Sequence, residues 1–189
     1  MEMFKNIRLN RGKAILRRKM MRMKRSRFKG NISSAKTMGL VWDASNPEEL
    51  QTLSLFHQKM AERNIDVKII GYFPGKNLPD KLTAIRYLAC LKKEDINVTF
   101  RPVSHEAEIF TDTGFDILID LNFKDVFPLR YLSYLSRAGF KVGIFDSTGE
   151  QSPFDLMIEL NKSTDINEYL THVIHYLEMI NTGSNKIGE

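Results

Sequence analysis

The sequence lacks the features of exported and membrane-embedded chains. It has one cysteine, Cys90, so no internal disulfide can form. No apolar run reaches about 18 residues, so no transmembrane helix is predicted, and the N-terminus lacks the apolar segment of a secretory signal. Together these absences predict a cytoplasmic protein. Cys90 itself lies among Leu88, Ala89 and Leu91, which favours a buried, inert thiol.

Motifs that bind nucleotides or activate nucleophiles are also missing. The sequence contains no G-x-G-x-x-G, no Walker lysine, no G-x-S-x-G and no H-E-x-x-H. We therefore expect no cofactor. His57 lies on an apolar helical stripe, as a core histidine does, while His172 and His175 share a polar face with Glu168 but lack a third ligand. No metal centre is predicted from the histidines.

Acidic residues are almost absent from the first 36 positions, and this is the most informative feature of the composition. Residues 1–36 contain thirteen Lys and Arg against one acid, Glu2, which gives a charge of +12. Residues 37–189 contain fifteen Lys and Arg against twenty-two acids, which gives −7 and recovers the net +5. The chain thus divides into a basic extension with a linker (1–36), one α/β domain (37–182) and a C-terminal tail (183–189).

The basic extension predicts a binding or assembly module that contacts a polyanion, with RNA or the ribosome as the expected partner. An anionic membrane surface is an alternative, because Phe4, Ile7 and Met21 could insert beside the cations. Contact with the acidic domain or a second copy of the chain, as in a homo-oligomer, is another. We expect residues 1–30 to pack little against the domain. The predicted nucleic-acid-binding residues are Arg8, Arg11, Lys13, Arg17, Arg18, Lys19, Arg22, Lys24, Arg25, Arg27 and Lys29.

From residue 37 onward, short apolar runs alternate with helical periodicity. This pattern predicts a mainly parallel sheet covered on both faces, in a three-layer Rossmann-like or flavodoxin-like α/β domain. Residues 81–112 fit no single pattern. The predicted strands are 38–42, 67–72, 116–121, 141–145 and 154–160, and the predicted helices are 46–63, 125–138 and 165–180, the second ended by Gly139.

Carboxylates follow several predicted strands, which raises an enzyme as the alternative function. Asp43, Asp120 and Asp146 stand at strand ends, where ligands bind in parallel α/β folds. If they converge, they form a candidate catalytic pocket or hold Mg²⁺. If each accepts backbone N–H groups, they only cap turns.

Two stretches of sequence carry resemblances to families. Residues 115–122, 141–143 and 154–158 resemble an uncharacterised Bacteroidota family with a basic N-terminus and a domain of unknown function, which supplies no activity. The D-x-x-I-D-L strand at 116–121, followed by Val142-Gly143, resembles the N-terminal half of heptosyltransferase-like glycosyltransferases. That likeness implies a phosphate- or sugar-handling enzyme, although the chain lacks their sugar-nucleotide-binding domain.

Overall fold

Six parallel strands form one sheet in the computed structural model, which describes residues 2–29, 31–145, 152–161 and 164–180. The strand order is β3-β2-β1-β4-β5-β6, which is the order of a Rossmann fold. The predicted α/β class with a parallel sheet is confirmed. The strands are β1 (Thr37–Asp43), β2 (Asp66–Tyr72), β3 (Leu88–Leu91), β4 (Ile117–Leu121), β5 (Phe140–Ile144) and β6 (Leu156–Ile158).

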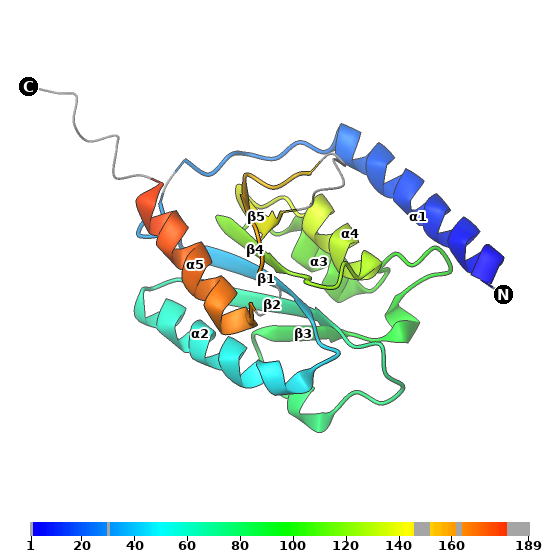
Figure 1. Cartoon of the computed structure of the whole chain (residues 1–189), viewed down its shortest axis with the longest axis horizontal. Coiled ribbons are helices and arrows are strands. Elements are labelled where there is room, and N and C mark those ends of the chain that lie inside the picture. The colour runs from blue at the N-terminus through cyan, green and yellow to red at the C-terminus, as the bar shows by residue number, and fades with distance from the viewer. Residues whose placement is uncertain (1, 30, 146–151, 162–163, 181–189) are drawn as a thin grey trace, which may run out of the picture.

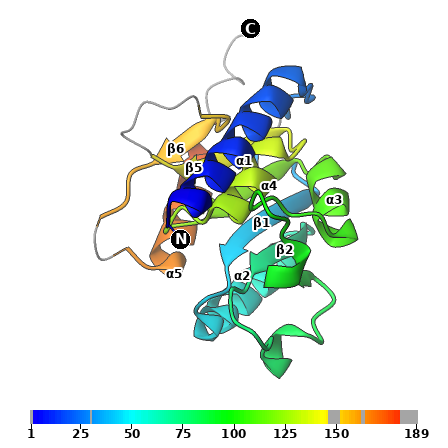
Figure 2. The ribbon, with the colours of Figure 1, turned by 90° about the vertical axis from the view of Figure 1, so that its right-hand side faces the viewer.

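Helices cover both faces of the sheet (Figures 1 and 2). One face carries α2 (Leu50–Glu62) and α5 (Ile166–Met179), and the other carries α3 (His105–Asp112) and α4 (Phe127–Leu135). Helix α1 (Glu2–Arg22) forms an outer layer beyond α4. Among the described residues, none of the helices combines the length and the apolar composition of a membrane span.

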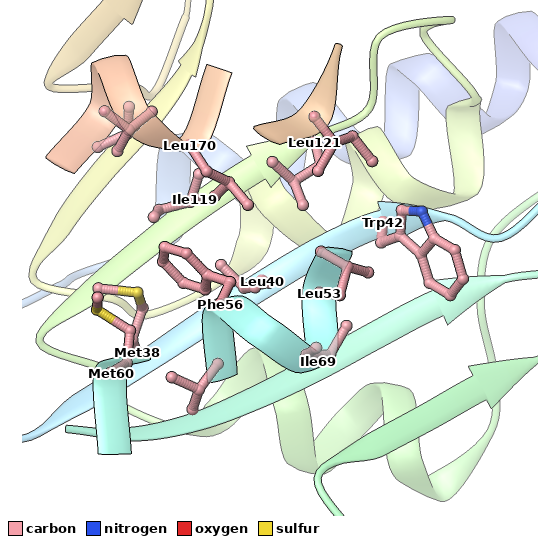
Figure 3. Close-up of a cluster of buried hydrophobic side chains, with 14 of the residues drawn as sticks. Met38, Leu40, Trp42, Leu53, Phe56, Met60, Ile69, Ile119, Leu121 and Leu170 are labelled. Atoms are coloured by element: carbon pink, nitrogen blue, oxygen red, sulfur yellow. The ribbon is translucent and has the colours of Figure 1, made fainter. Parts of the chain in front are cut away.

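The core follows from the alternation of side chains along buried strands. Met38, Leu40 and Trp42 of β1 point to the α2 face, and all three are fully buried (Figure 3). Val41 points to the opposite face and packs in the cluster beneath α3 and α4. Apolar residues on both faces explain why the inner strands read as continuous hydrophobic runs.

Two parts of the chain differ from the prediction. The unassigned region contains the short edge strand β3 and helix α3, with Ser104 accepting a cap hydrogen bond from the Ala107 N–H. Helix α4 ends at Leu135, earlier than predicted, because Ser136 adopts an extended backbone with ψ of 139°. Gly139 therefore does not end this helix. It lies where a Cβ atom would be 2.7 Å from the backbone nitrogen of Phe28.

The expectation that residues 1–30 pack little against the domain is wrong. Leu16 of α1 is 4% exposed, because it packs against α4. Ile32 and Ala35, in the stretch predicted as a linker, are also buried, and both belong to the main core. The basic extension is thus attached to the domain along much of its length, and its exposed side chains are presented from a fixed position.

Candidate anion-binding surface and groove

Helix α1 docks through a narrow stripe whose closest approach is at Gly12. A Cβ atom on this glycine would lie 2.3 Å from the Thr99 carbonyl oxygen and 2.9 Å from the ring of Phe127. Leu16, one turn along, packs with Phe127 and Tyr131. Only Gly12 and Leu16 of this helix are buried, so most of its circumference faces solvent.

Arg25 fastens the segment after α1 to the far edge of the sheet. Its guanidinium donates to the Ala138 carbonyl oxygen at 3.1 Å and pairs with the Asp155 carboxylate at 2.7 Å. The other oxygen of Asp155 accepts the backbone N–H of Lys141 at 2.9 Å. Burial raises the pKa of Asp155, but the hydrogen bonds from Arg25 and from Lys141 outweigh it, so the pKa lies below its ordinary value.

The outward face of α1 carries a ridge of cations, which we call the basic ridge: Arg11, Arg18 and Arg22. Their spacing places them together on the side opposite Leu16, and all three are exposed. Within the part of the chain that the structure describes, none of them has an ion-pair or hydrogen-bond partner. Phe4, Ile7 and Met21 lie on the same outward side and are 71%, 48% and 80% exposed. Basic and apolar side chains are therefore interleaved on this face.

The other predicted nucleic-acid-binding residues have different surroundings. Arg8 donates to the Val98 carbonyl oxygen and lies over the Phe100 ring. Lys19 lies 5.6 Å from the centre of the Tyr131 ring. Helix α1 is held partly by such contacts, which the sequence could not show. Lys24 and Lys29 are exposed, and Lys13, Arg17, Arg25 and Arg27 line a groove.

This groove has a volume of about 660 Å³ and lies between α1, α4 and residues 152–155. Its charged lining comprises five cations and one carboxylate: Lys13, Arg17, Arg25, Arg27, Arg130 and Asp155. Its apolar lining includes Met20, Met23 and Phe154. Sequence reasoning found four of these cations but missed Arg130 and the 152–155 wall, because they meet α1 only in the folded chain.

The two strand-end acids in the described part of the chain each accept a backbone N–H group close by in sequence. The Asp43 carboxylate accepts the Ser45 N–H at 3.0 Å, and the Asp120 carboxylate accepts the Asn122 N–H at 2.9 Å. Each of these two carboxylates thus caps its own turn. Asp146 lies outside the described residues, and among those described no three potential metal ligands cluster. The catalytic pocket of Asp43, Asp120 and Asp146 stays a prediction.

Asp120 and Lys141 are buried beneath α4, which the sequence did not indicate. Burial raises the pKa of Asp120 to about 7, an effect that the hydrogen bond from the Asn122 N–H only partly offsets. The Lys141 ammonium donates to the carbonyl oxygens of Ser133 and Tyr134 at 2.9 and 3.0 Å. Burial, aided by the charge of Arg25, lowers the pKa of Lys141 to about 7. Lys141 is fully buried, so its amine binds carbonyl groups at the end of α4 and does not reach solvent.

The histidines and the cysteine show no assembled site in the described chain. His57 stacks on Tyr87 with ring centres 3.8 Å apart, and burial lowers its pKa. His172 lies 3.8 Å from Glu168. Burial raises the pKa of Cys90 to about 11, so the thiol is protonated at neutral pH and is a poor nucleophile.

Comparison with known proteins adds a family but no activity. The model of a family of unknown function, DUF6913, matches residues 8–180. No curated protein matches the chain. The match confirms the predicted membership of a family of unknown function and includes most of the basic helix. It does not bear on the Bacteroidota source or the heptosyltransferase likeness, which stay predictions.

Proposed function

Because the chain belongs to the DUF6913 family of unknown function, we propose a function from its own geometry: it is a cytoplasmic RNA-binding module that contacts the phosphate backbone through the basic ridge of α1. The observation that carries this proposal is the docking of α1. A helix fixed by Gly12 and Leu16 holds Arg11, Arg18 and Arg22 outward on a rigid support. Cations fixed in this way can neutralise successive phosphates and release their counterions.

The cations continue beyond the helix, which favours an elongated partner such as a nucleic-acid strand over a membrane surface. Lys24, Arg27 and Lys29 are exposed on the extended segment that follows α1. Interfacial membrane helices instead separate a broad apolar face from a polar one. On α1 the exposed apolar residues are interleaved with arginines, so this separation is missing.

A membrane surface is the second candidate, because Phe4, Ile7 and Met21 are exposed beside the basic ridge. These side chains would supply a salt-resistant part of binding to anionic vesicles. Substitution of all three by Ser would abolish that part and leave RNA affinity nearly unchanged if RNA is the partner.

The test compares two variants of the full chain that lose the same charge. One carries Arg11→Gln, Arg18→Gln and Arg22→Gln. The control carries Lys59→Gln, Lys76→Gln and Lys93→Gln, three exposed cations outside α1. We expect the first variant to bind single-stranded RNA more weakly, with a slope of log affinity against log salt shallower by about 2, since each lost phosphate contact removes about 0.7. The control should bind as the unmodified chain does.

Two results would overturn the proposal. Equal losses in both variants would show that net charge alone drives binding. Unchanged RNA affinity in the first variant, together with salt-resistant binding to vesicles containing phosphatidylserine, would assign α1 to a membrane surface.

A further inference from the structure

The groove beside α1 has a composition that the basic ridge does not share. Its five cations lie beside an apolar wall of methionine and aromatic side chains, whereas the ridge offers charge and only scattered apolar side chains. We propose that this groove receives one unstacked nucleotide of a single-stranded RNA, which makes the protein selective for single strands over duplexes. The inference rests on the proposed RNA-binding function and names the form of RNA that it takes.

The charge of the groove calls for an anionic ligand. Arg25 and Arg27 share the single carboxylate of Asp155, so this trio keeps a net positive charge. Lys13, on the opposite wall, has no ion pair within the described chain. A phosphate bound in the groove between Lys13 and Arg27 would contact cations on both of its walls.

The apolar wall suits the face of a base. Phe154 is held flat against the backbone of β5, where a Cβ atom on Gly143 would lie 2.4 Å from its ring. The Tyr134 ring meets it edge-on, at 5.7 Å between centres and 90° between planes. Phe154 is thus a fixed aromatic surface, and Met20 and Met23 are adaptable neighbours. Aromatic rings in cationic grooves stack bases without reading their sequence.

The size of the groove supports a single nucleotide. Its volume of about 660 Å³ falls within the roughly 300–1,000 Å³ of small-ligand sites. Bases in an RNA duplex stay stacked and paired, so none can enter a groove closed by α1 on one side and residues 152–155 on the other. Duplex RNA can still meet the basic ridge through its phosphates.

The first experiment measures strand selectivity with the full chain. Phe154→Leu keeps an apolar side chain over Gly143 but removes the aromatic face. We expect this variant to lose roughly tenfold in affinity for a single-stranded oligonucleotide and to keep its affinity for the duplex of the same sequence. The Arg11, Arg18 and Arg22 variant should lose affinity for both. Thermal melting checks that each variant is folded.

The second experiment locates the ligand. Methyl-labelled methionines report the groove directly, and AMP, adenosine and inorganic phosphate are the probes. We expect AMP to shift the Met20 and Met23 methyl resonances, with weaker effects from adenosine and phosphate, and Lys13→Gln to weaken AMP binding.

The outcomes separate the two proposals. RNA binding that leaves these methyl resonances unmoved, with equal losses for single strand and duplex in Phe154→Leu, would overturn the groove and keep the ridge. Absence of RNA binding by the unmodified chain would overturn both.

Discussion

Asp120 shows at the residue scale how burial links stability to pH. The carboxyl lies beneath α4, and its pKa rises from about 3.8 to about 7. Between these pH values the folded chain holds more protons than the unfolded chain. The contribution of Asp120 to the free energy of unfolding therefore falls as the pH rises from about 4 to about 7, and it stays constant at higher pH.

Asp120→Asn is predicted to remove this loss of stability at neutral pH. The amide oxygen still accepts the Asn122 N–H, but the side chain no longer ionises. We expect the variant to match the unmodified chain near pH 4 and to be more stable at pH 8 by on the order of 2–4 kcal/mol. Urea unfolding at both pH values measures this. A constant difference across the range would show that the ionised carboxylate is well accommodated.

At the level of single residues, the sequence shows which side chains are charged but not which of them form ion pairs or are buried. Eleven basic residues stand out in the printed chain, yet nothing marks Arg25 as half-buried, because its partner Asp155 lies 130 positions away. Lys141 sits in a predicted strand without any sign that its ammonium is enclosed. Such contacts depend on tertiary structure, which local patterns do not encode.

At the scale of elements, the docking of α1 depends on the missing side chain of Gly12. Gly12→Ala is predicted to act in opposite ways on the helix and on its docking. Alanine favours a helix over glycine by about 1 kcal/mol, but here its methyl group would meet the Thr99 carbonyl oxygen. We expect faster amide hydrogen exchange in residues 9–20 together with an unchanged core.

Ala14→Gly serves as the matched control for that measurement. Ala14 is exposed on the outward side of α1, so its replacement lowers helix propensity without touching the docking surface. If exchange in Gly12→Ala were slower than in the unmodified chain, helix propensity rather than contact with the domain would govern the order of α1.

Elements buried on both sides could be predicted, and elements at the margin could not. The strands β1, β2, β4 and β5 are apolar runs within the sheet, and the predicted ranges match them closely. Strand β3 has four residues at the sheet edge and is mostly half-buried, so its sequence carries a weak signal. The sequence of α1 did not indicate its docked side. Its apolar residues, such as Phe4 and Met21, face solvent, whereas the docked stripe centres on a glycine.

At the scale of the whole molecule, Arg25 joins the N-terminal segment to β5 and to the chain before β6. Arg25→Met is predicted to cost roughly 3–5 kcal/mol, because Asp155 is then left buried without its main partner. Arg27→Met is the matched control, since Arg27 reaches the same carboxylate but its side chain is 67% exposed. We expect the control to cost less than about 1 kcal/mol.

Chemical denaturation measures both changes, and hydrogen exchange shows where they act. Faster exchange should appear in α1, β5 and β6 together in Arg25→Met. Loosening of α1 alone would mean that the fastening serves only the basic extension. Equal costs for the two variants would mean that Asp155 does not distinguish its partners.

The same fastening has a consequence for how the chain is made. Translation at roughly 5–20 residues per second separates the synthesis of Arg25 from that of Asp155, 130 residues later, by roughly 7–26 s. During this interval the carboxylate partner of the basic segment does not yet exist. Residues 1–36, with a net charge of +12, are therefore made well before the carboxylate that fastens them to the domain. The ion pair between Arg25 and Asp155 is thus formed late in biosynthesis, after most of the sheet has been made.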